Sequence, residues 1–434
     1  MMRFLYGWVL LPAAYALALV IAPLHRKLRR SLLARRGVWA RLEAARAERD
    51  PARPLVWFHV ASAGELLQAE PVIRRCGAAG AQVAVTVTSA SGMDWADRFS
   101  GMDGNIWTDA MPLDFPWALG RIWAALRPSA LVNLQAELWP GVVYEAAARG
   151  TPQLLIAARI GAGSSRIRSA WGRAFYRPLY RAMTAILALS EEDRERISRL
   201  VPGHPALETG GDPGIETALA RVREAVPAEL PPDFTARAGT ILVVGSSWPA
   251  DEAHLLPVLR EALERIGALR CIVAPHEPTE AHLTALETAL GPWGTVRLSA
   301  GAQTGGEPRS GAPPRVVLVD SVGRLASLYS AGHLAYVGGG FSTGVHNVAE
   351  PAAAGLPVLF GPRNGNSAVA QELLAEGAAF AVEDAGSLGL TLLPLLADAA
   401  RTAELGARAQ ALVTEMGGAA ELAYRRIRAA LPTW

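Results

Sequence analysis

Two runs of buried strands, each alternating with helical segments, restrict the fold of this 434-residue chain most strongly. In the first half the apolar stretches are PLVWFHV, AQVAVTVTS, LVNLQAELWP, TPQLLIAARI and AILALS; in the second they are TILVVGSS, RCIVAP, RVVLVD, LAYVGGG and PVLFGP. Strands separated by helical patterns pair in parallel through crossover helices. Because 434 residues exceed one ordinary core, the sequence predicts two doubly wound, Rossmann-like α/β domains.

The domain boundaries are predicted where the composition of the sequence changes. We expect the first domain at 51–210 and the second at 236–434, the latter ending in helices from Ala399 onward. Between them, 211–235 is an interdomain linker, because Gly and Pro lie at both ends of one short helix. Ser299–Arg315 is expected to be a mobile Gly/Pro/Ser-rich loop. Ligands of open α/β sheets bind at the carboxyl ends of the strands, so the expected site is a cleft between the domains.

The amino terminus differs from the rest of the chain. Residues 4–24 carry no charge, and six Lys or Arg residues follow between Arg26 and Arg36. About 20 apolar residues span a bilayer as a helix, and a basic flank stays in the cytoplasm. We therefore expect a membrane anchor at 1–24 and a basic juxtamembrane helix at 25–50, held to anionic headgroups of the inner membrane. A cleaved signal peptide fits less well, because only Arg3 precedes the apolar run. A helix lying in the interface stays open, since Pro12 and Pro23 interrupt the run.

Charge and composition exclude several classes of protein. A formal net charge of +2 gives no support for a nucleic-acid partner. Cys76 and Cys271 are far apart in sequence, which indicates a reducing compartment without a disulfide framework. The eight histidines show no zinc-ligand spacing, so no metal is expected.

Two carboxylates in the first half follow buried strands. Glu65 lies in FHVASAGELLQ at the start of a helix, and Glu137 lies in NLQAELWPG. Either residue fits an ordinary structural role, Glu65 stabilising a helix dipole and Glu137 acting as a helix-start acid or buried acceptor. A general base, however, needs a carboxylate beside the reacting hydroxyl. Acids at the ends of separate parallel strands are placed to meet in one cleft as a base and its partner.

Four strand ends in the second half carry small or polar groups. They lie in VVGSSWPADE, VAPHEPTE, DSVGRLASLY and GGGFSTGVHNVAEP. Backbone N–H groups at a helix start attract phosphate, although each stretch alone also fits an ordinary capped helix. Together they indicate a nucleotide lying across this domain, with Gly338–Gly340 admitting it closely. Neither a P-loop nor a GxGxxG fingerprint is present.

These stretches, in this order, resemble the bacterial Kdo transferases, which are membrane-anchored GT-B glycosyltransferases that attach 3-deoxy-D-manno-octulosonic acid (Kdo) to the lipid A precursor. The resemblance covers nearly the whole chain, through FHVASAGE, QAELWP, GSSWPADE, APHE, VGRLASLY and GGGFSTGVHNVAEP. It implies that Glu65 is the base and Glu137 a second essential acid. It also implies that CMP-Kdo is held by Ser246, Ser247, Pro275, His276, Gly323, Arg324, Leu325, Asn347 and Glu350, with Asn347 and Glu350 at the ribose.

The implied reaction is an inverting displacement by a lipid IVA hydroxyl, with CMP as leaving group and no metal or other cofactor. It belongs to lipopolysaccharide biosynthesis on the cytoplasmic side of the inner membrane. The chain departs from the family pattern where an Arg before His276 is lost and Arg324 is gained. Two alternatives remain: a GT-B-fold sugar-nucleotide isomerase or epimerase, and a non-catalytic, membrane-tethered nucleotide-sugar sensor.

Overall fold

The computed structural model describes residues 2–89, 92–94, 99, 101–102, 104–235, 239–299, 313–431 and 434. The chain divides into two compact units. Unit 1 comprises Met1–Thr217 and Gly417–Trp434, and unit 2 comprises Ala218–Met416. Most of the loop predicted at Ser299–Arg315 lies outside the described residues.

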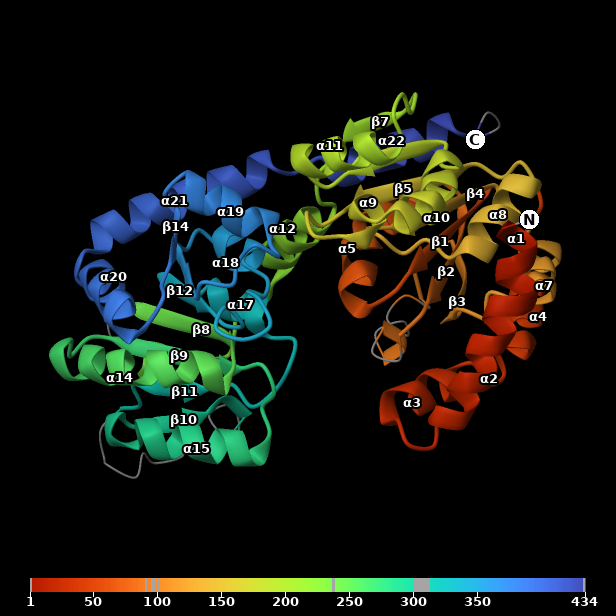
Figure 1. Ribbon diagram of the computed structural model, residues 1–434. Coiled ribbons are helices and arrows are strands. Elements are labelled where there is room, and N and C mark those ends of the chain that lie inside the picture. Colours follow the sequence, from red (N-terminus) through yellow and green to blue (C-terminus); the bar gives the residue numbers. More distant parts are fainter. Residues whose placement is uncertain are drawn as a thin grey trace. The chain divides into compact units, whose positions relative to one another are not determined.

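The described strands of unit 1 form one parallel sheet in the order β3-β2-β1-β4-β5-β6-β7 (Figure 1). Helices α5 and α22 cover one face, while α4, α7, α8, α10 and α11 cover the other. The bounds are β1 (Leu55–Val60), β2 (Gln82–Val87), β3 (Asn105–Ala110), β4 (Ala130–Leu134), β5 (Gln153–Ala158), β6 (Ala185–Ala188), β7 (Leu207–Thr209), α4 (Val38–Glu48), α5 (Ala63–Ala78), α7 (Pro116–Leu126), α8 (Pro140–Ala148), α9 (Ser165–Arg168), α10 (Ala170–Arg181), α11 (Glu191–Leu200) and α22 (Ala419–Ala429).

Unit 2 contains a second parallel sheet, in the order β10-β11-β9-β8-β12-β13-β14. Its central strands are buried on both faces, as their continuous apolar sequences predict. The bounds are β8 (Ile241–Ser247), β9 (Arg270–Pro275), β10 (Thr295–Arg297), β11 (Val316–Leu318), β12 (Leu334–Val337), β13 (Val358–Phe360), β14 (Ala379–Ala381), α13 (Pro232–Thr235), α14 (Pro249–Arg265), α15 (Glu280–Leu290), η3 (Gly291–Trp293), α17 (Leu325–Tyr329), α18 (Ala349–Ala353), α19 (Ala368–Ala375), α20 (Ala385–Ala397) and α21 (Ala399–Glu415).

The last helix belongs to unit 1 rather than to the predicted second domain at 236–434. Ala420, Ala423 and Ile427 of α22 are buried in the same core as β1 and α5. The Glu216 carboxylate, on α12 (Gly214–Glu224), accepts hydrogen bonds from the backbone N–H groups of Gly418 (3.0 Å) and Ala420 (2.9 Å). Apolar burial and this helix cap therefore return the chain to unit 1 after unit 2 is complete.

The amino-terminal segment is helical from Met2 to Ile21, as α1 (Met2–Leu5), a π-helical turn (Tyr6–Leu10) and α2 (Leu11–Ile21). Within the described residues, none of the helices combines the length and apolar composition needed to cross a membrane. The basic stretch at 25–50 forms two helices, α3 (Arg26–Ala34) and α4, instead of the predicted one. Gly37 separates them, because its φ of 73° is left-handed and ends helical geometry.

Candidate active site

Glu65 lies in the first turn of α5, directly after β1. The Ser62 hydroxyl caps the helix by accepting a hydrogen bond from the Glu65 N–H (3.4 Å). The Glu65 carboxylate turns back and accepts one from the Ala61 N–H (2.7 Å). The S-A-G-E sequence thus holds a carboxylate at the carboxyl end of a central strand.

The environment of Glu65 raises its pKa to about 7. Burial is the main cause, since the side chain has little contact with water and the charged form is penalised. The Ala61 N–H opposes this shift, while the nearby negative charge of Glu137 adds to it. The charge of Glu137 thus acts on Glu65, so the two predicted acids of unit 1 belong to one electrostatic environment. A carboxylate with a pKa near neutral accepts protons efficiently at physiological pH.

Glu137 lies in a turn between β4 and α8 and is half-buried. Its carboxylate accepts a hydrogen bond from the Trp139 indole N–H (3.2 Å). The Trp139 ring packs edge-on against the buried His59 ring, with centroids 5.7 Å apart. Burial lowers the pKa of His59 to about 4, so this ring is neutral at pH 7. Trp139 thus fixes the second acid against a rigid, uncharged part of the sheet.

A chain of amide and carboxylate contacts links the two segments that carry the acids. Gln135 donates to Gln68 (2.9 Å), and Gln68 donates to the Asp212 carboxylate (2.7 Å). Gln68 lies one turn after Glu65 on α5, and Gln135 has a left-handed φ of 49° at the end of β4. Sequence reasoning missed these residues; the only signal for Gln68 was its i+3 spacing from Glu65.

A buried carboxylate also fixes the start of α8, which follows Glu137. Asp114 accepts hydrogen bonds from the N–H groups of Gly141 (2.7 Å) and Val142 (2.9 Å). The Tyr6 hydroxyl of the amino-terminal helix is a third partner. A side chain at Gly141 would meet the Asp114 carboxylate at 2.5 Å, so only glycine fits there. The amino-terminal helix is in this way attached to the segment that carries the second acid.

In unit 2 the four polar strand ends predicted from sequence follow β11, β9, β8 and β12, which are consecutive in the sheet. Their candidate residues therefore lie along one edge of it. Ser246 has a left-handed φ of 53° where β8 ends, and Gly323 has a φ of 84° before α17. His276 follows Pro275 at the end of β9 and is joined to β8 by its N–H, which donates to the Ser247 carbonyl (2.9 Å).

The side chains at this edge differ in how free they are to bind a ligand. The Ser247 hydroxyl is buried and donates to Glu252 (2.7 Å). Arg324, by contrast, is exposed at the start of α17, where Leu325 begins the helix. Asn347 is exposed and caps the following turn by accepting from the Ala349 N–H (2.9 Å).

Glu350 is a buried carboxylate on α18. It accepts a hydrogen bond from Arg221 (3.3 Å). Burial raises its pKa, and the positive charge of Arg221 opposes that shift. The ion pair holds Glu350 in one orientation three residues after Asn347.

The three glycines at Gly338–Gly340 allow the backbone of this loop to pack closely against neighbouring backbone. A Cβ on Gly338 would lie 2.2 Å from the Ser246 carbonyl oxygen, and one on Gly340 would lie 2.5 Å from the Gly361 nitrogen. Gly339 has a φ of 92°, and its Cβ would meet the Gly344 carbonyl oxygen at 2.3 Å. Neighbouring backbone, within unit 2 itself, excludes any side chain at these positions.

Aromatic rings form a layered arrangement beside the glycines. The ring planes of Trp248 and His346 are nearly parallel, at 15° with centroids 6.3 Å apart, and the Trp248 indole N–H donates to Nε2 of His346 (2.8 Å). His276 stacks on both, with centroid distances of 4.6 and 4.4 Å. Burial lowers the pKa of His276 and of His346. Because Nε2 of neutral His346 is an acceptor, its proton lies on Nδ1, which leaves that N–H to donate.

Asp251 joins α14 to the glycine loop. Its fully buried carboxylate accepts hydrogen bonds from the N–H groups of Trp248 (3.0 Å), Gly339 (2.8 Å) and Phe341 (3.3 Å), and from the Tyr336 hydroxyl (3.3 Å). One side chain therefore satisfies backbone donors from two strand ends. Trp248, Asp251 and His346 lay in motifs that sequence analysis quoted, but their own roles were not predicted.

Comparison with known proteins shows which family the chain belongs to. A family profile described as 3-deoxy-D-manno-octulosonic-acid transferase (kdotransferase) matches residues 33–212. A 3-deoxy-D-manno-octulosonic acid transferase of Bordetella pertussis is 30% identical over 427 residues, which cover 92% of this chain and 93% of that protein. This chain belongs to the Kdo transferase family. The resemblance predicted from the motifs is confirmed.

Solved structures support the fold of this Kdo transferase family chain. UDP-GlcNAc 2-epimerase from Neisseria meningitidis matches with a TM-score of 0.58 and 11% identity, covering 83% of this chain and 99% of that one. The glycotransferase of kitacinnamycin matches with a TM-score of 0.53 and 17% identity, covering 88% and 100%. At these identities the likeness shows the fold alone. The prediction of a two-domain α/β fold of the GT-B class is confirmed.

Proposed function

We propose that this chain transfers Kdo from CMP-Kdo to a sugar hydroxyl of a lipid A precursor, the tetraacylated lipid IVA, in lipopolysaccharide biosynthesis. One observation carries the proposal: in a Kdo transferase family chain, a buried carboxylate beside a second acid has its pKa raised to about 7. Such a group is suited to deprotonate a sugar hydroxyl.

In the proposed reaction Glu65 takes the proton of the acceptor hydroxyl as the oxygen attacks the anomeric carbon of Kdo. The bond between that carbon and the CMP phosphate oxygen breaks, and CMP leaves with the bonding electrons from the opposite face. The configuration at the anomeric carbon is inverted, and no covalent sugar-enzyme intermediate forms. Burial raises the pKa of Glu65, and the charge of Glu137 adds to that shift. No metal or other cofactor is required by this scheme, because CMP is a good leaving group.

We propose that the donor binds at the carboxyl edge of the unit 2 sheet. Exposed Arg324 and the N–H groups that begin α17 would stabilise the charge of the departing phosphate. The Nδ1–H group of His346, whose ring is oriented by Trp248, would donate a further hydrogen bond to CMP-Kdo at this edge. Asn347 and Glu350 would bind the ribose hydroxyls. We propose that CMP-Kdo also contacts Ser246, Ser247, Pro275, His276, Gly323 and Leu325. Ser247 would act through its backbone, because its hydroxyl already donates to Glu252.

We further propose that residues 4–24 hold the chain to the inner membrane, with the units in the cytoplasm. Support comes from the apolar side chains that the segment exposes: Trp8 is 58% exposed, Val20 73% and Leu24 91%. The arginines of α3 follow immediately and would meet anionic headgroups. The acyl chains of the proposed acceptor stay in the same leaflet.

The proposal is tested by measuring whether the consumption of CMP-Kdo depends on the presence of lipid IVA. Full-length protein in detergent is given CMP-Kdo generated in situ, with or without lipid IVA, and CMP release is followed. We expect release only when the lipid is present. An epimerase-like activity would release the nucleotide without lipid, and a sensor would release none; either result contradicts the proposal.

The rate should depend on pH through Glu65. Since the base must be deprotonated, kcat/KM is expected to rise with pH and level off above about 7. Glu137→Gln removes the charge that raises the pKa of Glu65, so the rise should move to lower pH in whatever activity remains. A pH profile of kcat/KM for both proteins measures this. An unchanged midpoint in Glu137→Gln would show that the two acids are not coupled.

Glu350→Ala is expected to weaken CMP binding by about 10- to 100-fold, the effect of removing charge-assisted hydrogen bonds. Isothermal titration with CMP measures the affinity, and the circular dichroism spectrum checks that the fold is retained. Glu372→Ala, an exposed carboxylate on α19, is the matched control and should bind CMP normally. Unchanged affinity in Glu350→Ala would remove this residue from the donor site.

A further inference from the structure

Helices α9 and α10 form a basic segment that the proposed reaction does not use. Between Ile160 and Ser190 the chain contains five arginines (Arg166, Arg168, Arg173, Arg177 and Arg181) and no aspartate or glutamate. Such a segment is unusual in a chain whose acidic and basic residues nearly balance overall. The charge is therefore concentrated on one part of unit 1.

One face of α10 combines this charge with an exposed aromatic ring. Trp171 is 87% exposed, and Ala174, Pro178 and Arg181 continue the exposed face at helical spacing. Arg168 is exposed one turn before Trp171. A large ring flanked by guanidinium groups and small apolar residues is the pattern of a helix that lies in a membrane interface.

The arginines of this segment lack acidic partners. Arg173 donates to the Ile167 carbonyl (2.8 Å), Arg177 donates to the Leu200 carbonyl (2.9 Å), and Arg166 lies over the Tyr176 ring. In the described part of the chain, none of the five forms an ion pair with a carboxylate. Their positive charge is not neutralised by the protein.

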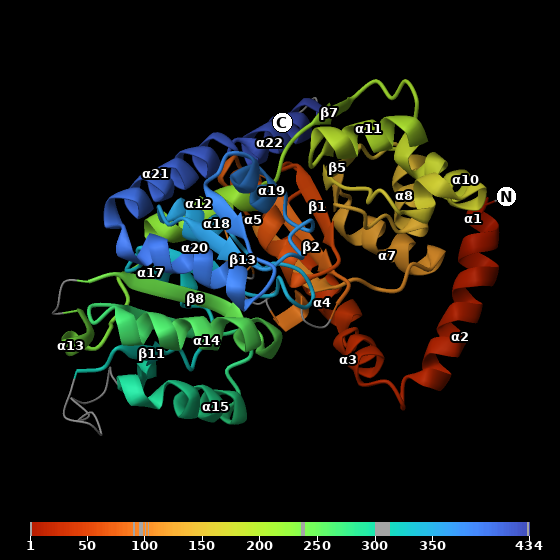
Figure 2. The ribbon, with the colours of Figure 1, turned by 60° about the vertical axis from the view of Figure 1, so that its left-hand side comes forward.

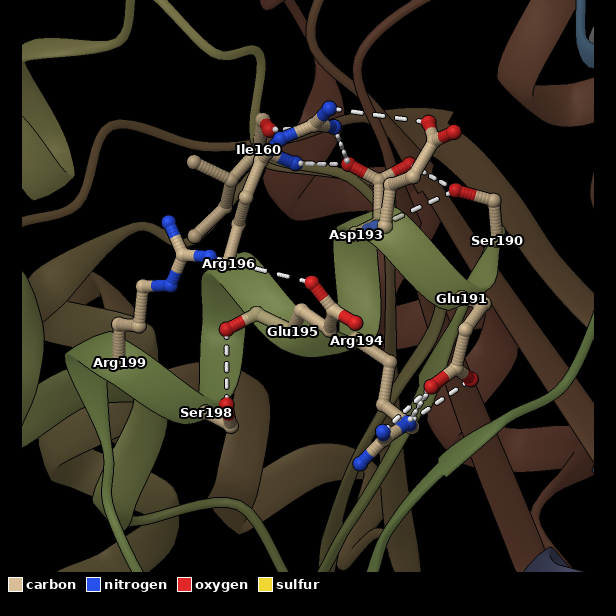
Figure 3. A network of polar contacts seen from close by, with 10 residues as sticks. Ile160, Ser190, Glu191, Asp193, Arg194, Glu195, Arg196, Ser198 and Arg199 are labelled. Atoms are coloured by element: carbon tan, nitrogen blue, oxygen red, sulfur yellow. Dashed lines mark hydrogen bonds and ion pairs between the residues drawn. The ribbon is translucent and has the colours of Figure 1, made fainter.

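The neighbouring helix α11 shows the opposite arrangement. Figure 3 shows that its arginines lie among its own acids, Arg194 against Glu191 and Arg196 against Asp193. Arg199 pairs with Glu195 in the same way (3.8 Å). Among the described residues, the arginines of α11 are thus paired with acids of the same helix, whereas those of α9 and α10 are not.

Helix α10 lies close to the start of the amino-terminal segment. Helix α8 contacts both α10 and the first turns of the amino-terminal segment, α1 and its π-helical turn. Figure 2 shows α10 beside the start of the chain. A bilayer that holds the apolar amino-terminal helix would therefore be within reach of Trp171.

We propose that the exposed face of α9 and α10 docks on an anionic bilayer surface, with Trp171 in the headgroup region and Arg168 and Arg181 against lipid phosphates. Each arginine near an anionic surface gains favourable electrostatic energy, and an interfacial indole adds apolar burial. This contact is separate from the amino-terminal helix and gives the body of unit 1 a second attachment, which fixes its orientation on the membrane.

The test places an environment-sensitive fluorophore on Trp171→Cys in the full chain, reconstituted in vesicles of phosphatidylcholine with or without phosphatidylglycerol. Cys76 and Cys271 are buried, so labelling is directed to the new thiol. Leu390→Cys, on an 82% exposed position of α20, is the matched control. We expect the emission at position 171 to shift to shorter wavelength with phosphatidylglycerol and to be quenched by spin-labelled lipid. High salt should return the emission to its original wavelength, because it screens the attraction between arginine and lipid charges. Position 390 should show none of these changes.

A charge variant separates the electrostatic part of the contact. In Arg168→Gln with Arg181→Gln, the dependence of the Trp171→Cys signal on phosphatidylglycerol should be lost, whereas Arg401→Gln with Arg408→Gln on α21 should preserve it. A signal that is the same in both vesicles would overturn the proposal. So would a shift that follows protein density rather than lipid charge, because that result indicates a second copy of the chain. The measurement uses neither donor nor acceptor and is independent of transferase activity.

Discussion

Glu65→Gln is expected to lower kcat for Kdo transfer by about 10²- to 10⁴-fold, the usual contribution of a general base. The substitution keeps the size of the side chain and its contact with the Ala61 N–H, but the amide cannot take a proton at neutral pH. The rate loss should therefore appear in kcat, while the affinity for CMP, which we assign to unit 2, stays unchanged. Initial rates of CMP release and a CMP titration measure the two quantities.

The matched control is Glu70→Gln on the same helix, whose half-buried carboxylate pairs with the exposed Arg74. It should retain activity within about twofold, since an ion pair with an exposed partner contributes little and glutamine keeps the size of the side chain. If Glu65→Gln kept most of its rate, the base would have to be another group. In that case the raised pKa of Glu65 would reflect only its buried position.

Asp251→Ala is expected to destabilise unit 2 by about 3–5 kcal/mol, because it leaves three backbone N–H groups and one hydroxyl without their buried acceptor. For a unit of this size the loss corresponds to a fall in Tm of roughly 10 °C. The glycine loop and Trp248 would lose their fixed positions, so CMP binding should weaken as well. Differential scanning calorimetry and a CMP titration check both effects.

Asp398→Ala provides the comparison for this variant. Asp398 also caps a helix, accepting from the Arg401 N–H (2.9 Å), but it is exposed. Its loss should cost only ~1 kcal/mol and leave CMP binding intact. Equal destabilisation by the two substitutions would show that Asp251 acts as an ordinary cap and does not organise the donor edge.

The alternation of strands and helices was sufficient to predict both sheets, but the edge strands were missed. β3, β7, β10 and β14 lie at the edges, where a strand is half-exposed or short and needs no continuous apolar sequence. The predicted end of the second domain at residue 434 was wrong for a related reason. The apolar face of α22 is evident in the sequence, but the sequence around it does not indicate which hydrophobic core it packs against.

The candidate residues were predicted from sequence motifs, whereas the residues that hold them in place could be identified only from the structure. Glu65 and Glu137 stand out as acids after apolar strands, but the Gln68, Gln135 and Asp212 contacts join segments distant in sequence. The triple glycine was recognised from the sequence as a point of close approach. The structure adds that neighbouring backbone, such as the Ser246 carbonyl, makes such an approach, which the sequence alone did not indicate.

Mass spectrometry of the lipid after incubation with CMP-Kdo shows directly whether the chain transfers Kdo to lipid IVA. With the wild-type chain, we expect lipid IVA to gain Kdo in proportion to the CMP released, and we expect Glu65→Gln, with CMP binding intact, to produce almost none. Unmodified lipid in the wild-type reaction, or equal amounts of product from both proteins, would contradict it.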